Sequence, residues 1–386
     1  MTAVRPVSAD VETVLQGVAR LGPVIAARAG EFEKARRLPA DLREQLTALG
    51  CFRLSLPASH GGAGADLPSL LRVFEALGRA DASVGWTVMI GSCAWCDIAD
   101  LPRAPFDALY ADGPDVVIGG VFAPSGVAVA VERGYRVRGR WAFASGCEDA
   151  DWLYGNCTEA TEDGHRLRTV LFAPGEVTIE DTWDVLGMRG TGSHHFRAED
   201  VVVPAGRTAL LFVDEPGLDT PIVRIPPPQL YALGVASVAI GTAHGALEEI
   251  RALAAEKVPL LAGSTLAASG LFQFQLATAD TELRAARAVV HDHAAEAWAT
   301  AAHGSPFAPV QRARLRAAAA WATGRAAAAI DVAYRAGGSH ALHADHPLQR
   351  RLRDVHTISQ HFLVRPDTLT TAGAVLAGQE VDLTVF

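Results

Sequence analysis

The chain has 386 residues, 49% of them hydrophobic and 20% charged, which is the balance of a globular protein with room for two or three domains around a large core. Its formal net charge of −9 argues against nucleic acid or an anionic membrane surface as a partner, because both require a basic face. Five cysteines in a chain of this length do not suggest a disulfide framework, so we expect a cytoplasmic protein.

The start of the chain has no long apolar stretch, and we expect no signal peptide. No uninterrupted apolar stretch approaches the roughly 18 residues of a membrane span. Cys93 and Cys96 have C-x-x-C spacing but lack a second pair that would complete a zinc site. We interpret them as buried structural thiols rather than redox groups.

The first third of the chain is predicted to be helical and forms a domain over residues 1–114. Apolar residues at helical spacing predict helices over 8–50, where Pro39 opens the second helix and Gly50 ends it. Further helices are expected over 68–80 and 83–99. The glycine-rich loop at 60–64 lacks the lysine of a phosphate-binding loop, so we interpret it as a turn.

Short β-rich runs separated by Gly, Pro and Asp turns predict a β domain over 115–212. Within it, the aromatic residues Trp141 and Phe143 precede a small-residue turn at 144–146 that contains Ser145. Small side chains let a backbone approach a flat ligand, and a serine offers both its hydroxyl and its N–H. On these residues alone, an ordinary hairpin with a buried aromatic pair explains the pattern equally well.

The remaining residues, 213–386, are predicted to form a third, helical domain. A proline-rich linker at 213–227 precedes predicted helices over 229–256, 265–302, 308–336 and 347–377. Their alanine-rich faces are typical of tight helix–helix packing in a bundle. The order of elements is therefore α, then β, then α.

Four motifs, in this order, resemble the acyl-CoA dehydrogenase superfamily over almost the whole chain. They lie at 120–126, at 139–146, at 187–193, and at Gly337-Gly338 followed by Arg353-Asp354. The resemblance implies an α+β fold with an N-terminal α domain, a central β-barrel or sandwich and a C-terminal four-helix bundle.

One departure from the dehydrogenases bears on the chemistry. Those enzymes use a glutamate base about eight residues after the Arg-Asp motif, and Phe362 stands near that position here. No carboxylate occurs between Val355 and Pro366, or over 229–247, where some relatives place the base. Abstraction of an α-proton therefore has no evident base.

His361 instead resembles the histidine of a sister group, the two-component reduced-flavin-dependent monooxygenases. That resemblance implies a flavin C4a-hydroperoxide, formed from oxygen and from reduced FMN or FAD that a separate NAD(P)H flavin reductase supplies. It implies a hydrophobic, cyclic or aromatic small-molecule substrate that is hydroxylated or oxidised. Many members carry a second histidine before a tryptophan of the N-terminal domain, but residues 92–95 read Ser-Cys-Ala-Trp here, which makes a phenol substrate less favoured.

The resemblance also assigns the candidate site residues and a homotetramer. His361 and Ser145 are expected to be catalytic, as acid or base and as hydrogen-bond partner near flavin N5. The expected cofactor contacts are Phe122, Ser125, Phe143, Ser145, Arg189, Ser193, Gly337 and Gly338. The expected substrate pocket contains Trp86, Cys93, His356 and Phe362. No metal is expected, because the adjacent His194 and His195 would point to opposite faces of a strand.

Two other functions stay open on the sequence. One is an acyl-CoA or acyl-carrier dehydrogenase whose base comes from an unexpected position. The other is a flavin-binding homologue that has kept the fold and lost activity, which the missing glutamate would also explain. The sequence does not choose between FMN and FAD.

Overall fold

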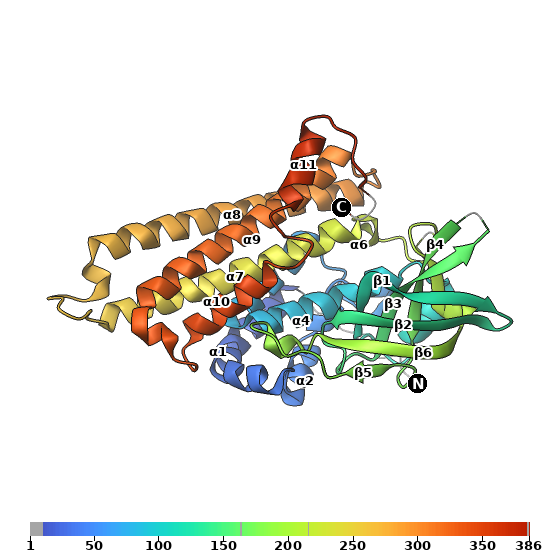
Figure 1. The fold of residues 1–386 in the computed structure, drawn as a ribbon, viewed down its shortest axis with the longest axis horizontal. Coiled ribbons are helices and arrows are strands. Elements are labelled where there is room, and N and C mark those ends of the chain that lie inside the picture. The colour runs from blue at the N-terminus through green and yellow to red at the C-terminus, as the bar shows by residue number, and fades with distance from the viewer. Residues whose placement is uncertain (1–10, 163, 215, 384–385) are drawn as a thin grey trace.

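A computed structural model describes residues 11–162, 164–214, 216–383 and 386 (Figure 1). The segment on which the expectation of no signal peptide rests, 1–10, lies outside the described residues. The predicted domain boundaries fall in connections, between α5 and β1 and between β7 and α6, and remain a prediction. The elements of the first unit are α1 (Val11–Ala35), α2 (Ala40–Ala48), α3 (Leu67–Ala80), α4 (Ala82–Cys93), the 3-10 helix η3 (Ala94–Ile98) and α5 (Arg103–Leu109).

The central unit is one continuous mixed sheet, seven strands wide within the described residues, in the order β5-β6-β2-β1-β3-β4-β7. β1 pairs parallel to β3, and the other neighbours pair antiparallel. The strands are β1 (Ile118–Val131), β2 (Gly134–Ala144), β3 (Trp152–Thr161), β4 (Gly164–Phe172), β5 (Thr178–Glu180), β6 (His194–Pro204) and β7 (Thr208–Leu210).

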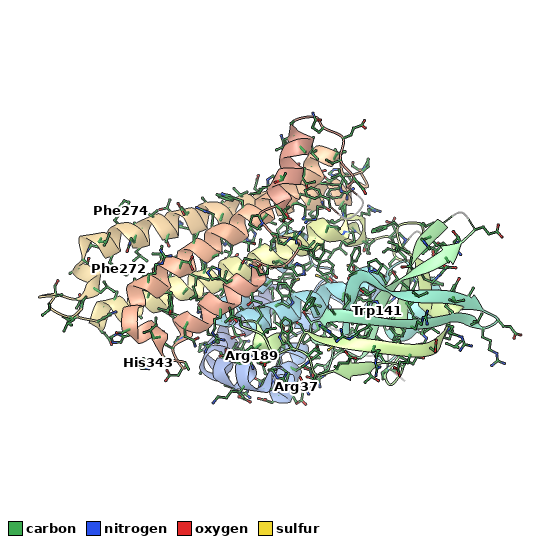
Figure 2. The ribbon with its side chains drawn as sticks, in the orientation of Figure 1. Arg37, Trp141, Arg189, Phe272, Phe274 and His343 are labelled. Atoms are coloured by element: carbon green, nitrogen blue, oxygen red, sulfur yellow. The ribbon has the colours of Figure 1, made fainter. Side chains whose placement is uncertain are left out.

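Trp141 on β2 forms the centre of the sheet core and is fully buried (Figure 2). Its ring stacks on Phe196 at 4.9 Å between centroids, and its indole N–H donates to the carbonyl of Asn156. Glycines on β1, β2 and β3 lie against the same ring. A Cβ added at Gly155 would lie 2.6 Å from the indole Cε2, and one added at Gly139 would lie 2.8 Å from Cη2. These glycines therefore make room for an aromatic side chain of the protein itself.

The C-terminal unit is a bundle of α7, α8, α9 and α10, which lie side by side and extend away from the sheet (Figure 1). α7 is long and apolar enough to cross a bilayer, but 89% of the relevant window is buried inside the protein, where it packs on α3 and α9. It is thus placed as the core helix of the bundle. The helices are α6 (Pro221–Arg224), α7 (Pro227–Glu256), α8 (Gly270–Ala302), α9 (Pro309–Gly337), α10 (Pro347–Ile358) and α11 (Thr368–Leu376).

The architecture of helical unit, sheet and helical bundle is confirmed, but some predicted helices end elsewhere. The helix predicted over 347–377 is wrong, because α10 ends at Ile358 and α11 begins at Thr368. Pro366 has no N–H to donate and disfavours helical backbone at Arg365, which favours a break in the helix before α11. The interval at 359–367 is a loop that contains His361. The helix predicted over 83–99 likewise changes to 3-10 geometry after Cys93.

Candidate functional site

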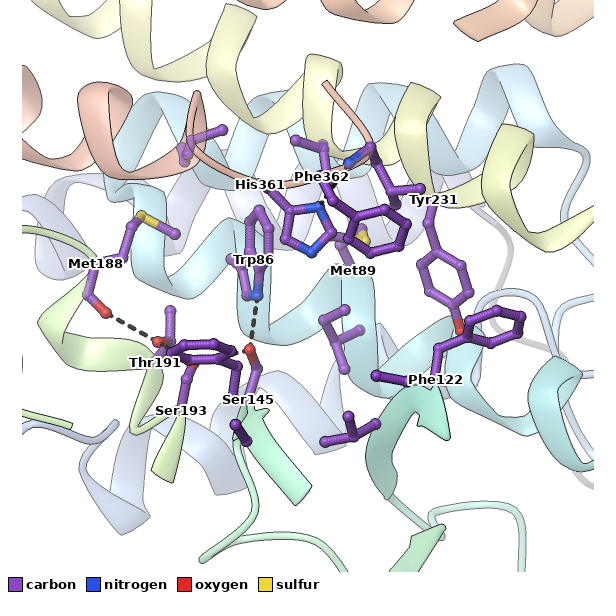
Figure 3. Close-up of a pocket in the computed structure, with 18 of the residues that line it drawn as sticks. Trp86, Met89, Phe122, Ser145, Met188, Thr191, Ser193, Tyr231, His361 and Phe362 are labelled. Carbon is purple, nitrogen blue, oxygen red and sulfur yellow. Dashed lines mark hydrogen bonds between the residues drawn. The ribbon is translucent and has the colours of Figure 1, made fainter. Parts of the chain in front are cut away.

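A cavity of about 470 Å³ lies where α4, the sheet, the first turns of α7 and the loop after α10 meet (Figure 3). Its volume is in the range of small-molecule and cofactor sites, and its walls are mainly apolar and aromatic. Among the described residues that line it there is no Lys, Arg, Asp or Glu. The few polar groups of the lining therefore decide which ligand it can hold.

The first polar group comes from the turn after β2. Phe143 and Gly146 both have positive φ, at 70° and 69°, which makes the chain reverse sharply around Ser145. The N–H of Gly146 donates to the carbonyl of Thr191 and ties this turn to the start of β6. Phe143 is 66% exposed, so a large apolar surface at the cavity is left open although the rings of Trp183 and His195 lie edge-on to it.

Ser145 belongs to a row of hydrogen bonds whose direction is fixed at both ends. Trp86 Nε1, which can only donate, lies 2.9 Å from Ser145 Oγ, and the carbonyl of Met188, which can only accept, lies 2.8 Å from Thr191 Oγ1. Between them the hydroxyls of Ser145, Ser193 and Thr191 are 2.8 Å and 2.6 Å apart.

The direction of the row follows from these two ends. Thr191 gives its proton to Met188, so Ser193 donates to Thr191 and Ser145 donates to Ser193. Ser145 accepts from Trp86, and what its hydroxyl still offers to the cavity is a lone pair. This hydroxyl is therefore an acceptor.

His361 reaches the cavity from the loop at 359–367, opposite the Ser145 turn (Figure 3). Its ring lies edge-on to Trp86, at 5.3 Å between centroids, so Trp86 touches both His361 and Ser145. The loop is held from behind by the buried Arg316 of α9, whose guanidinium donates to the carbonyls of Phe362 and Leu363.

His361 is neutral at neutral pH and presents a donor. Burial, together with the nearby guanidinium of Arg316, lowers the pKa of His361 from 6.5 to about 4. Its Nδ1 accepts from the N–H of Leu363 at 3.4 Å, which leaves the single proton of the neutral ring on Nε2. The sequence predicted that His361 acts as an acid or a base. An Nε2–H group facing the cavity can donate a hydrogen bond but cannot take a proton, so the role that remains for His361 is that of a donor.

A second polar group of the cavity was not found in the sequence. Tyr154 of β3 and Tyr231 of α7 both line the cavity, and both hydroxyls donate to Oδ2 of Asp97 in η3, at 2.8 Å and 2.5 Å. Asp97 is 7% exposed, and burial raises the pKa of its carboxyl to about 6. The chain has only five tyrosines, and a tyrosine at the start of the otherwise apolar α7 was the available signal.

Seven of the predicted site residues line this one cavity. They are Trp86, Phe122, Phe143, Ser145, Ser193, His361 and Phe362. The sequence reasoning missed Met89, Tyr154, Trp183, Thr191 and Tyr231, which line the cavity with them. Thr191 lies within one of the motifs quoted above, whereas the others are aromatic or apolar residues whose spacing is equally typical of a core.

The structure places the other predicted residues outside the cavity lining. Cys93 is buried in the core and lies 3.7 Å from the Ser92 hydroxyl. His356 is on the outer side of α10, where it pairs with Asp331 of α9 at 2.9 Å. Ser125 is exposed on β1.

The remaining cofactor predictions lie in two further places. Arg189 bonds Asp184 and the carbonyl of Val185, each at 2.8 Å. Gly337 and Gly338 form the end of α9, where the Gly337 carbonyl accepts from Lys257 at 2.6 Å. A role for these residues toward a cofactor stays a prediction.

The described residues contain no group of three or more metal-ligating side chains that could hold a metal ion. His194 is buried and accepts the N–H groups of Thr182 and Trp183 at its Nδ1. The five cysteines are free, and burial raises the pKa of the Cys93 thiol to about 12. Burial of the Cys93 thiol disfavours the reactive thiolate form.

The residues around Ser145 fit a flat, polar-edged ring such as a flavin. The serine lone pair, the uncovered Phe143 ring and the apolar walls provide an edge contact and a face contact. Beside them, Nδ1 of His195 is buried without a partner among the described residues, and the His195 ring lies 5.5 Å from that of Phe143. A buried polar atom without a protein partner needs a water, an ion or a ligand to satisfy it.

Comparison with known proteins also supports a flavin site. The family models described as acyl-CoA dehydrogenase, N-terminal domain, and acyl-CoA dehydrogenase, C-terminal domain, match residues 19–101 and 233–366. An indole-3-acetate monooxygenase of Acinetobacter baumannii is 32% identical over 91% of this chain and 90% of its own length. The oxygenase subunit HsaA, a flavin-dependent monooxygenase of Rhodococcus jostii, is 31% identical over 92% of this chain and 95% of its own.

Solved structures superpose over nearly the whole length. A 3-HSA hydroxylase from a Rhodococcus species gives a TM-score of 0.91 at 28% identity, with 98% of this chain and 100% of that chain covered. XiaF from a Streptomyces species, solved with FADH2 and glycerol, gives 0.90 at 26% identity, with 96% of each chain covered.

Proposed function

Because this chain belongs to the acyl-CoA dehydrogenase superfamily and, within it, to the flavin-dependent monooxygenases, we propose that it is the oxygenase component of a two-component system and oxidises a hydrophobic aromatic substrate. It is an oxidoreductase that uses reduced flavin. A separate NAD(P)H flavin reductase supplies the reduced FMN or FAD, and molecular oxygen is the co-substrate.

The observation that carries this proposal is the pairing of Ser145 and His361 across one apolar cavity, with Trp86 between them. N5 of a reduced flavin bears a proton, and Ser145 presents the lone pair that such a proton needs. His361 presents a neutral N–H from the opposite wall. Ser145 thus complements the N5 edge of a flavin. His361, from the opposite wall, can donate a hydrogen bond to an oxygen atom bound in the cavity.

Each part of the cavity has a role in this proposal. The flavin, when bound, supplies the oxygen chemistry. Ser145 orients the ring edge and holds a proton at N5, the apolar walls exclude water, and His361 donates from Nε2. The Ser193 and Thr191 hydroxyls act through Ser145, because they fix the direction of its proton.

The dehydrogenase alternative requires a carboxylate base that can reach the substrate. Phe362 lines the cavity near the position where the sequence comparison placed that base, and none of the described lining residues is Asp or Glu. The geometry therefore favours oxygenation over α-proton abstraction.

We further propose a homotetramer, built through the outer face of the bundle. Leu260 and Leu261 at the turn after α7 are 93% and 98% exposed, and Leu271 and Phe274 on α8 are 67% and 69% exposed. Figure 2 shows Phe274 on this outer side of α8. An exposed apolar surface of this kind is typical of a subunit interface. Cytoplasmic location stays a prediction.

The test uses the complete chain with a generic flavin reductase, NADH, FMN or FAD, indole and ¹⁸O₂. We expect one labelled oxygen atom in the product and little hydrogen peroxide. His361→Ala should bind flavin normally but lower coupled product formation by about 100-fold, the typical contribution of a positioned donor. His361→Gln restores an N–H donor and should recover part of that loss.

His303→Ala is the matched control, since His303 is an exposed histidine on the bundle. Full coupled turnover in His361→Ala would remove His361 from the mechanism. Flavin bleaching by an acyl-CoA, without incorporation of labelled oxygen, would overturn the monooxygenase proposal in favour of the dehydrogenase.

A further inference from the structure

We propose that the cavity selects an uncharged aromatic substrate carrying an N–H or O–H donor, and that Asp97 sets this selectivity by holding the hydroxyls of Tyr231 and Tyr154. This inference rests on the proposed function and goes further, because it names the substrate class. It also separates this chain from relatives named for indole-3-acetate, an anion at neutral pH.

The hydrogen bonds of Asp97 fix what the tyrosines can offer. A carboxylate only accepts, so both tyrosine protons are committed to its Oδ2. The phenolic oxygens of Tyr154 and Tyr231 then have lone pairs left and no proton. Figure 3 shows Tyr231 and Phe122 on one side of the cavity and Ser145 and Ser193 on the other. A phenolic oxygen on this side can therefore only accept a hydrogen bond, so a substrate that binds it must supply the donor.

The charges around the cavity disfavour an anion. No Lys or Arg is found among the described lining residues, and no described cation forms an ion pair with Asp97. Burial raises the pKa of Asp100, and the nearby charges of Asp214 and Asp97 raise it further, so this region is negative. Arg316 stands behind the His361 loop and not in the lining, with two of its nitrogens bonded to loop carbonyls. A substrate carboxylate would lose its hydration and meet no cationic side chain in the described lining.

Asp97 is held as a fixed acceptor. It is buried, it joins η3, β3 and α7 through its two tyrosines, and its Oδ1 has no partner among the described residues. A buried carboxylate without a cationic partner is costly, so its position beside a ligand cavity supports a role beyond packing. Asp97 does not line the cavity and acts through the tyrosines, as a positioning residue.

The experiment measures binding of three probes to the flavin-loaded protein. Dissociation constants for indole, 1-methylindole and indole-3-acetate are determined by anaerobic equilibrium dialysis with reduced FMN or FAD. We expect indole to bind about fivefold to tenfold more tightly than 1-methylindole, which lacks the donor. Indole-3-acetate should bind at least tenfold more weakly than indole.

The variants distinguish the effect of hydrogen bonding on probe affinity from the effect of cavity shape. Tyr231→Phe removes one acceptor and should bring the ratio between indole and 1-methylindole toward one, whereas Tyr334→Phe, outside the cavity lining on α9, should leave it unchanged. Asp97→Asn removes the negative charge and, with its amide nitrogen at the Oδ2 position, would release both tyrosine protons. It should raise the affinity for indole-3-acetate relative to indole, which a merely structural role would not do.

An unchanged ratio in Tyr231→Phe would overturn the inference, as would indole-3-acetate binding as tightly as indole. Failure of the protein to bind indole would overturn it as well. Should Asp97→Asn fail to fold, Tyr231→Phe still decides. Incorporation of labelled oxygen is measured separately, so the monooxygenase proposal can stand while this one fails.

Discussion

In the proposed flavin site, the hydroxyl of Ser145 would distinguish the two redox states of the cofactor. Oxidised flavin has a lone pair at N5 and reduced flavin has a proton there, whereas Ser145 offers a lone pair in either case, because its own proton goes to Ser193. Two lone pairs facing each other repel. With N5 placed against Ser145 as proposed, the row from Trp86 to Met188 would favour the reduced cofactor, which suits an oxygenase supplied by a separate reductase.

Removing either serine should change the preference between the two redox states in a characteristic way. Ser145→Ala should weaken binding of reduced flavin about fivefold to tenfold and leave oxidised flavin little changed. Ser193→Ala frees the Ser145 proton and should strengthen binding of oxidised flavin. Anaerobic and aerobic titrations of flavin fluorescence measure both constants, with the exposed Ser59→Ala as control. Equal changes for both redox states would contradict the fixed direction of the row.

His361 should stay neutral well below the usual pH of imidazole titration. Its pKa is lowered to about 4, so its neutral form stabilises the fold above pH 6.5, and this stabilisation is lost as the pH falls toward 4. At pH 5 the loss is about 2 kcal/mol. The ¹³C signal of labelled His361, assigned by its absence in His361→Gln, should not move between pH 8 and 5.5. A midpoint near 6.5 would contradict a buried, neutral ring.

At the scale of elements, the sequence supported the strands, the turn at Ser145 and most helices, because their periodicity and their Gly and Pro boundaries are local. The loop at 359–367 was hidden because its residues continue an apolar, helix-like pattern. What fixes its shape is Arg316, which comes from a different helix and binds the carbonyls of Phe362 and Leu363. Similarly, Asp97, Tyr154 and Tyr231 lie far apart in sequence, and only the packing of η3, β3 and α7 brings them together.

The sheet core gives a prediction at the same scale. Gly155→Ala would place a methyl group 2.6 Å from the fully buried ring of Trp141, which the neighbouring strands prevent from moving. Such overpacking should lower the free energy of unfolding by about 1–3 kcal/mol. Gly30→Ala on α1 is the control, since a Cβ there meets nothing within 4 Å and should be neutral or slightly stabilising. Urea unfolding measures both, and equal stabilities would contradict tight packing at Trp141.

For the whole molecule, the exposed leucines and Phe274 predict that association depends on the outer face of the bundle. The double variant Leu260→Glu with Phe274→Glu should dissociate the proposed tetramer, because charged side chains disrupt an apolar interface. Light scattering after size-exclusion chromatography gives the mass. Val129→Glu, at an equally apolar, 56% exposed position on β1, should leave the mass unchanged. A double variant that keeps the wild-type mass would place the interface elsewhere.

The cavity draws its walls from positions between Trp86 and Leu363, contributed by the first helical unit, the sheet and the bundle. Contacts between segments so far apart in sequence close late in folding, since long loops must be ordered first. During synthesis, a chain that has reached only the end of the sheet contains Ser145 and Trp86 but no opposite wall. The oxygenase thus becomes competent to bind its ligands only after nearly the whole chain has left the ribosome and the bundle has docked.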